Sequence, residues 1–203
     1  MLIVRVLKKI VGFLSQTDPN MSHEILVSNG NLKIGKDTNI SSALISIFQP
    51  QTNNLNIEIG SDCIISGKLV LLNTNTKVKI GNRVFIGPDT TLFCYESIEI
   101  QDDVMISWGC TLIDTNAHAL SSENRKNDVL DWAKGPQYKN WDLVESKPIC
   151  VEKKSWIGFN SIVTKGVRIS EGTIVASGSV ATKSTNPFDI VGGNPAQFIK
   201  KTD

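Results

Sequence analysis

Aliphatic residues recur at every sixth position over much of this chain. A period of six fits neither an α-helix, which repeats every 3.6 residues, nor a hairpin sheet, which alternates in twos. It predicts short strands separated by corners, with one aliphatic side chain pointing inward from each unit. The runs are Ile59, Ile65 and Leu71; Ile80, Ile86, Leu92 and Ile98; Ile100, Ile106 and Leu112; and Val151, Ile157, Val163, Ile169, Val175 and Ala181.

Three such units make one triangular coil of roughly 18 residues, and successive coils stack to bury a shared core. Five similar segments mark the same position on successive coils, so we predict that they pair as parallel strands. Their first residues are 25, 21, 20 and 51 positions apart, and the last spacing requires a loop that leaves the stack. The segments are Leu32–Ile34, Ile57–Ile59, Val78–Ile80, Ile98–Ile100 and Ile149–Val151.

The iterated pattern aliphatic–small–x–x–small–x resembles the hexapeptide-repeat acyltransferases, and within them the bacterial sugar O-acetyltransferases. The most specific segments are Ser155–Gly158, Ser177–Lys183 and Val191–Ala196. The resemblance implies an all-β fold, a left-handed parallel β-helix over residues 32–201, with residues 1–31 as an N-terminal cap segment. The left-handedness comes from the family, because spacing alone does not show it.

The two ends and one internal segment depart from the six-residue period. Residues 1–14 have a broad apolar helical face, which predicts a short helix that caps the stack. Basic residues within that helix leave open a peripheral membrane contact. Pro195 predicts the start of a short C-terminal helix. The loop at residues 119–148 is polar but carries Trp132 and Trp141, which either contact a sugar or pack on the chain itself.

Composition excludes several classes of function. The chain has 203 residues, with 21 Lys and Arg against 20 Asp and Glu, so no global charge draws it to nucleic acid. No apolar run reaches about 18 residues, so we expect no membrane-spanning helix. Two histidines and four cysteines without CxxC spacing argue against disulfides, and against the zinc site of the carbonic anhydrases that share this kind of helix. We expect no metal and a cytoplasmic protein, with the inner face of the membrane left open.

His118 stands where the repeat stops. It follows Leu112 by six positions, so a polar residue replaces the next inward aliphatic side chain just before the loop. Histidine suits a general base, since its ordinary pKa lies near neutrality. The resemblance implies the same role, because the family's catalytic histidine precedes the loop that leaves the helix. Asp114 or a backbone carbonyl would orient the ring, and Asn116 is a candidate contact for the acceptor sugar. His23, before the repeats, is expected to be structural.

The resemblance also implies acetyl-CoA as acyl donor, bound in a groove between parallel helices of adjacent subunits in a homotrimer. Residues 151–203 carry a net charge of +3 and residues 21–150 carry −4, which agrees with a phosphorylated ligand near the C-terminal part. The implied donor-binding residues are Trp156, Gly158 and Phe159, with the Phe159 N–H at the thioester carbonyl; Ser177 and Gly178 at the pantetheine; and Lys183 and Lys200 at the 3′-phosphate, with Lys165 and Lys201 behind them.

These inferences together predict an O-acetyltransferase that acts on a sugar hydroxyl of a cell-surface polysaccharide (O-antigen or capsule) or its precursor. His118 would deprotonate the hydroxyl for direct attack on the thioester. N-acetylation of an amino sugar or nucleotide-sugar, O-acetylation of an antibiotic, and a non-catalytic β-helix remain alternatives. The sequence does not determine the acceptor sugar or the hydroxyl position.

Overall fold

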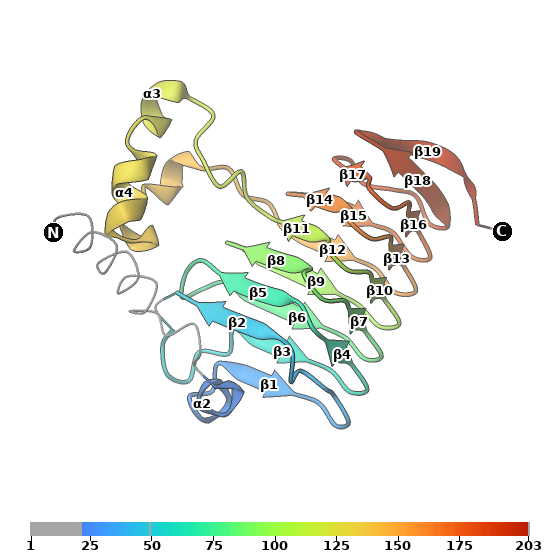
Figure 1. Cartoon of the computed structure of the whole chain (residues 1–203), viewed down its shortest axis with the longest axis horizontal. Helices are drawn as coiled ribbons and strands as arrows, with labels where there is room; N and C mark the ends of the chain where they lie inside the picture. The colour runs from blue at the N-terminus through green and yellow to red at the C-terminus, as the bar shows by residue number, and fades with distance from the viewer. Residues whose placement is uncertain (1–21, 49, 203) are drawn as a thin grey trace, which may run out of the picture.

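The chain winds as a three-sided stack of short parallel strands (Figure 1). The computed structural model describes residues 22–48 and 50–202, so the predicted helix at residues 1–14 lies outside the described residues. Each turn of the chain visits three sheets in succession, which we name A, B and C. This is the parallel β-helix that the six-residue period predicts.

The strands of each sheet are adjacent in the stack but distant in the sequence. Sheet A contains β1 (Leu32–Ile34), β3 (Ile57–Ile59), β6 (Lys77–Ile80), β9 (Ser97–Ile100), β12 (Ile149–Val151) and β15 (Arg168–Ile169). Sheet B contains β4 (Ile64–Ile65), β7 (Phe85–Ile86), β10 (Met105–Ile106), β13 (Trp156–Ile157), β16 (Ile174–Val175), β18 (Asp189–Gly193) and β19 (Ala196–Lys201). Sheet C contains β2 (Leu44–Ile47), β5 (Lys68–Leu71), β8 (Thr91–Cys94), β11 (Thr111–Ile113), β14 (Ile162–Thr164) and β17 (Val180–Ala181).

The predicted register of the five similar segments is confirmed. Leu32 lies opposite Ile57, Ile57 opposite Val78, Val78 opposite Ile98, and Ile98 opposite Ile149, all in parallel pairs. The aliphatic residues of the hexad runs form the core, and each is at most 2% exposed. Every coil therefore contributes at least one inward side chain per sheet, and the coils bury one another.

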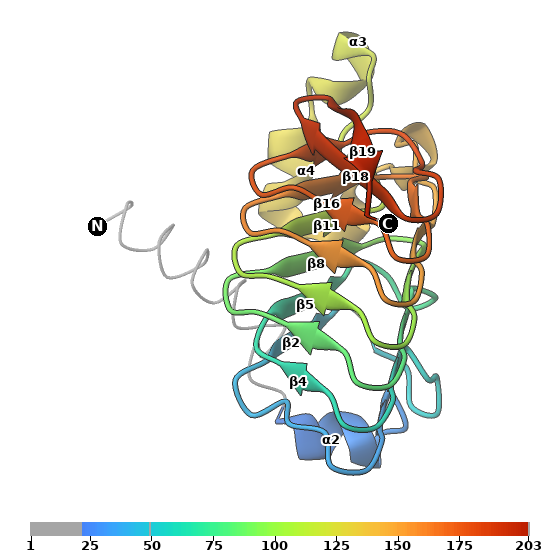
Figure 2. The same ribbon diagram turned by 90° about the vertical axis from the view of Figure 1, so that its right-hand side faces the viewer.

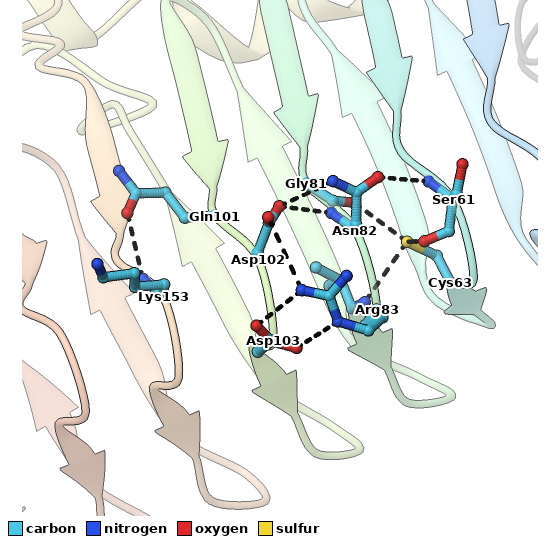
Figure 3. A network of polar contacts seen from close by, with 10 residues as sticks. Ser61, Cys63, Gly81, Asn82, Arg83, Gln101, Asp102, Asp103 and Lys153 are labelled. Carbon is cyan, nitrogen blue, oxygen red and sulfur yellow. Dashed lines mark hydrogen bonds and ion pairs between the residues drawn. The ribbon is translucent and has the colours of Figure 1, made fainter.

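A ladder of polar contacts joins neighbouring coils at the corner between sheets A and B (Figure 3). The Ser61 N–H donates to Asn82 Oδ1 at 2.9 Å, and the Asn82 N–H donates to Asp102 Oδ1 at 2.7 Å. The coils approach so closely here that a Cβ added to Gly81 would lie 2.3 Å from Asp102 Oδ1. This corner therefore requires glycine at Gly81 and side-chain acceptors on the next coil.

The two ends of the stack are covered differently (Figures 1 and 2). At one end, α2 (His23–Ser28) buries Leu26 against the first coil, and His23 Nε2 lies 3.1 Å from the Ala43 carbonyl oxygen, which agrees with a structural role for this histidine. At the other end, the predicted C-terminal helix is wrong, because β19 pairs antiparallel with β18. A short isolated helix is marginal in water, whereas the exposed edge of β18 supplies backbone partners.

The outer faces of the sheets differ in chemistry. Sheet A carries charged side chains, including Lys33 and Glu58, whose Nζ and Oε1 atoms are 2.6 Å apart. Sheet B carries a ladder of exposed apolar side chains at matching positions on four coils. These are Ile64, Phe85, Met105 and Trp156.

The predicted loop leaves the stack between β11 and β12 (Figure 1). We call residues 119–148 the excursion. It contains α3 (Ser122–Arg125), α4 (Asp128–Lys134) and two 3₁₀ turns, η1 (Pro136–Tyr138) and η2 (Trp141–Leu143). Its short helices place side chains of the excursion beside the end of β11.

Candidate active site

Backbone contacts close the root of the excursion. Thr115 forms an antiparallel bridge with Ser146, and the Lys147 N–H donates to the Asp114 carbonyl oxygen at 2.8 Å. The chain that leaves after β11 of sheet C and the chain that returns to β12 of sheet A are therefore held together at this root. His118 follows directly, with a side chain that is 49% exposed and open to an incoming substrate.

The ring of His118 is held by a carboxylate of α4. Its Nδ1 atom lies 2.5 Å from Oδ2 of Asp128, the first residue of that helix. A carboxylate only accepts hydrogen bonds, so Nδ1 of His118 carries the proton and donates it to Asp128. In the neutral ring, Nε2 then has the free lone pair that a general base requires.

A lysine side chain completes the cluster. Lys139, which follows η1, contacts Asp128 Oδ2 through Nζ, and the same Nζ atom lies 3.3 Å from His118 Nδ1. The Lys139 side chain is only 1% exposed, and its ammonium lies 5.6 Å from the centroid of the Trp141 ring. Burial alone would raise the pKa of Asp128, but the hydrogen bonds from Lys139 and His118 outweigh it and hold that pKa below its ordinary value.

The prediction that Asp114 orients His118 is wrong, because Asp128 occupies that place. Asp114 is fully buried and accepts hydrogen bonds from the N–H groups of Tyr95 at 2.7 Å and Glu96 at 2.8 Å. Its carboxyl also accepts from the Cys94 thiol, and burial raises the pKa of Asp114. The Asp114 side chain therefore joins two neighbouring coils and does not hold the ring of His118.

The aromatic residues of the excursion pack mainly on the chain itself. Trp141 stacks on Tyr95 with ring centroids 4.6 Å apart, and Trp132 meets Trp141 edge-on at 6.3 Å. This is the packing alternative that the sequence left open, although both tryptophans remain partly exposed beside the cluster. The backbone N–H of Asn116 donates to the Glu145 carbonyl oxygen, so Asn116 helps to close the root of the excursion.

The predicted donor-binding residues gather at the corner between sheets B and C. Trp156 Nε1 donates to Ser107 Oγ at 3.2 Å, and the ring of Phe159 stacks on Trp108 with centroids 5.1 Å apart. Both rings of this stack are exposed. Within the described part of the chain, the Phe159 N–H makes no hydrogen bond, which leaves it able to donate to a ligand carbonyl.

Small residues line the same corner on this coil and on the next one. A Cβ added to Gly158 would lie 2.6 Å from the backbone nitrogen of Ser177, so the coils approach too closely for any larger residue. Gly178 has a φ of +71° and donates its N–H to the Phe159 carbonyl oxygen at 2.8 Å. The two coils are therefore closely packed at this corner, with Gly158 buried and Ser177 and Gly178 exposed.

Two of the four lysines have partners within the chain. Lys165 pairs with Glu145 at 3.1 Å, and Lys201 pairs with the buried carboxylate of Asp189 at 2.7 Å. Lys200 lies exposed on β19. Lys183 lines a cleft of about 150 Å³ between the last coil and β19. Lys165 and Lys201 are thus engaged in ion pairs within the chain, whereas the predicted phosphate contacts of Lys183 and Lys200 stay a prediction.

The histidine cluster and the donor-binding corner lie at opposite ends of β11. Trp108 precedes the strand and His118 follows it, so at least about 10 Å of extended chain separates the two corners. Figure 1 shows the excursion on one side of the stack and β13 and β16 on the other. A single copy of the chain therefore presents the two halves of the predicted site on different edges.

Sequence reasoning missed Asp128 and Lys139. Both lie among many charged residues of the excursion, and no spacing distinguishes them from Asp131 or Lys134. The one available signal was their position after His118 in a segment predicted to be functional.

Over residues 22–48 and 50–202, no group of three or more His, Cys, Asp or Glu side chains is arranged to hold a metal ion. None of the helices in that same part of the chain has the length and hydropathy of a membrane-crossing segment.

The β-helix of hexapeptide units is thus interrupted once, by an excursion that directly follows a carboxylate-bound histidine. Residues 148–183 match the family model described as hexapeptide repeat of succinyl-transferase. This match and the likeness to known acyltransferases support the hexapeptide-repeat acyltransferase family, and the fold is the left-handed parallel β-helix of its solved members.

Known proteins similar to this chain include both O- and N-transferring enzymes. Galactoside O-acetyltransferase from Lactococcus lactis is 28% identical over 71% of this chain and 62% of its own length. Galactoside O-acetyltransferase from Escherichia coli is 26% identical over 65% of this chain and 58% of its own length. The chain thus spans about three fifths of these relatives. A variant of the N-acyltransferase AntD from Bacillus cereus, solved with dTDP and coenzyme A, is 28% identical over 90% of both chains, with a TM-score of 0.66.

Proposed function

We propose that this protein is an acetyl-CoA-dependent O-acetyltransferase that acts on a sugar hydroxyl of a cell-surface polysaccharide or its precursor. The observation that carries the proposal is the pairing of His118 Nδ1 with Asp128, which leaves Nε2 as the proton acceptor. The names of the galactoside O-acetyltransferases support a sugar hydroxyl as the acceptor.

In this mechanism, His118 Nε2 takes the proton of the acceptor hydroxyl while the hydroxyl oxygen attacks the thioester carbonyl carbon. The carbonyl oxygen becomes an oxyanion, for which the Phe159 N–H is the proposed donor. The carbon–sulfur bond then breaks and the ester is released. The protonated His118 Nε2 gives its proton to the leaving thiolate, which departs as the thiol of coenzyme A and restores the neutral imidazole. No acyl-enzyme is needed, because acceptor and donor react directly.

We propose that the site is completed in a homotrimer. His118 and the Trp108–Phe159 stack lie at opposite ends of β11, so a second copy is needed to bring a histidine cluster to a donor-binding corner. The exposed apolar ladder of sheet B supplies a surface of the kind that subunit contacts bury. Lys183 and Lys200 are the proposed contacts for the phosphates of the donor, with Ser177 and Gly178 at the pantetheine amides.

N-acyl transfer to an amino sugar is the second candidate, favoured by the likeness to AntD over most of the chain. It would use the same base and the same donor corner. Trp132 and Trp141 remain proposed acceptor contacts in either case, through the parts of their rings that are exposed.

Acetyl transfer from labelled acetyl-CoA to a panel of galactosides, surface oligosaccharides and nucleotide-linked amino sugars tests the proposal. We expect ester products from a sugar hydroxyl, with amide products as the sign of the second candidate. The His118→Ala variant should lose about 100-fold or more in kcat, because a positioned base contributes at least that much.

Calorimetric titration with coenzyme A supplies the control for folding and donor binding. His118→Ala should bind coenzyme A as the wild-type protein does, because none of the proposed donor contacts is made by the imidazole. Wild-type turnover by this variant would remove His118 from the mechanism. The lack of saturable acetyl-CoA binding by the wild-type protein would favour a non-catalytic β-helix.

A further inference from the structure

Lys139 is a buried cation whose placement calls for a functional reason. Its Nζ atom contacts the Asp128 carboxylate and lies 3.3 Å from His118 Nδ1, and its side chain is 1% exposed. Burying an ammonium is costly, and fixing the ring of His118 needs Asp128 alone. Lys139 therefore does something that the histidine–aspartate pair does not do by itself.

We propose that Lys139 is a positioning residue that neutralises Asp128 and so keeps His118 unprotonated and able to act as a base. This inference rests on the proposed function of the same site. A lone carboxylate beside the ring would stabilise the imidazolium form, which has no lone pair to accept a proton. With Lys139 in place, the neutral ring completes a cluster of zero net charge, and protonation of His118 adds an unbalanced positive charge.

The other charged groups near the ring do not replace Lys139. Arg125 of α3 donates to the carbonyl oxygens of Ala119 and Leu120, which ties its guanidinium to the backbone just after His118. Asp114 is occupied by N–H groups of the neighbouring coil. The Glu145 carboxylate, at the root of the excursion, pairs with Lys165. Among the residues that the structure describes, Asp128 and Lys139 are the charged groups in contact with Nδ1.

Nuclear magnetic resonance provides a test that does not need catalysis. The chain has two histidines, so a His23→Gln background leaves His118 as the one imidazole signal. In Lys139→Met, which keeps a long unbranched side chain without the charge, the His118 ring should titrate about one pH unit or more higher than with Lys139 present. Whichever member of the His118–Asp128 pair binds the proton, the pair takes it up at higher pH.

A matched control comes from the same excursion. Lys134 lies on α4, is 62% exposed and pairs with Asp131 rather than with the cluster. Lys134→Met should leave the titration of His118 unchanged. Lys139→Arg, which retains the positive charge, should restore the wild-type titration at least in part.

Kinetics provide a second readout. The acidic limb of the kcat/KM profile should move to higher pH in Lys139→Met, so the loss should be greatest at low pH and should shrink as pH rises. A residue with only a structural role would lower the rate equally at every pH. If Lys139→Met unfolds the excursion, a double variant that combines Asp128→Asn with Lys139→Met should refold it, because neither new side chain is charged. The His118 ring of this double variant should take up its proton at a lower pH than in Lys139→Met.

The outcomes separate this inference from the proposed function. An unchanged ring titration in a folded Lys139→Met variant would overturn the role of Lys139, even if the wild-type protein transfers acetyl groups. A raised titration without any acetyl transfer by the wild-type protein would uphold the electrostatic role and reject the proposed reaction.

Discussion

Asp128 Oδ2 lies 2.5 Å from His118 Nδ1, although ten positions separate the two residues along the chain. The contact forms because the excursion turns back after α3 and presents the first residue of α4 to the ring. The stack places the histidine backbone, but the folded excursion decides which ring nitrogen bears the proton. The proposed role of His118 as a base therefore depends on the folded excursion.

Asp128→Asn tests the orientation of the ring. An asparagine can turn its amide N–H toward Nδ1, which would stabilise the tautomer with the proton on Nε2, the wrong one for a base. We expect kcat to fall by about tenfold or more, as part of the contribution of a positioned base. Asp131→Asn, on the same helix and paired with Lys134, should keep the wild-type rate in the same acetyl-transfer assay. Equal losses in both variants would point to the helix rather than to the contact.

Asp114→Asn should weaken the fold and leave coenzyme A binding intact. Asp114 is fully buried, and each of its two carboxylate oxygens accepts a hydrogen bond from a backbone N–H. The side-chain amide of asparagine has a single oxygen, so its NH₂ end cannot accept the second of these hydrogen bonds. The expected cost is about 1–3 kcal/mol at pH 7, measured by urea unfolding. No loss of stability would show that the buried carboxylate contributes little.

The difference in stability between the wild-type protein and Asp114→Asn should depend on pH, with a sign that follows from the pKa of Asp114. Burial raises the pKa of Asp114 in the folded state, so the folded protein binds this proton more tightly than the unfolded chain. Its contribution is present below the unfolded pKa, about 4, and is lost as pH rises through the folded pKa. The stability difference between wild type and Asp114→Asn should therefore be larger at pH 4 than at pH 7, and the opposite slope would contradict it.

Gly158→Ala should disturb the donor corner more than Gly178→Ala. The new Cβ at Gly158 would meet the Ser177 nitrogen at 2.6 Å, so two coils must separate, at a cost of about 1–3 kcal/mol. At Gly178 nothing lies within 4 Å, and only the positive φ of +71° opposes alanine, at about 1 kcal/mol. Thermal unfolding measures both, and a weaker affinity for coenzyme A is expected for Gly158→Ala.

Met105→Glu should dissociate the proposed trimer. Met105 lies in the exposed apolar ladder of sheet B, where a buried unpaired carboxylate would be costly in a subunit contact. Sedimentation velocity should show a smaller and inactive species, whereas Lys36→Glu, at a side chain that is 87% exposed, should leave the assembly unchanged. A wild-type protein that is active as a monomer would contradict both the trimer and the shared site.

The six-residue period predicted the fold well because it is a local property with a direct physical meaning. Each inward aliphatic side chain sits at a constant spacing, so the pairing of Ile57 with Val78, or of Ile98 with Ile149, could be foreseen across a long insertion. The prediction of a C-terminal helix was wrong because no local pattern decided the structure there. Pro195 is compatible with a helix start and with a hairpin turn, and the free edge of β18 decided between them.

The sequence by itself determined the coil, its register, the point where the chain leaves the stack and the histidine at that point. The tertiary structure alone decided that Asp128 rather than Asp114 holds the ring of His118. It also decided that Lys139 lies buried beside His118, Asp128 and Trp141, and that the donor corner faces away from His118. Contacts within an excursion depend on where its short helices turn. No repeat constrains those turns, so residues ten or more positions apart meet only once the chain has folded.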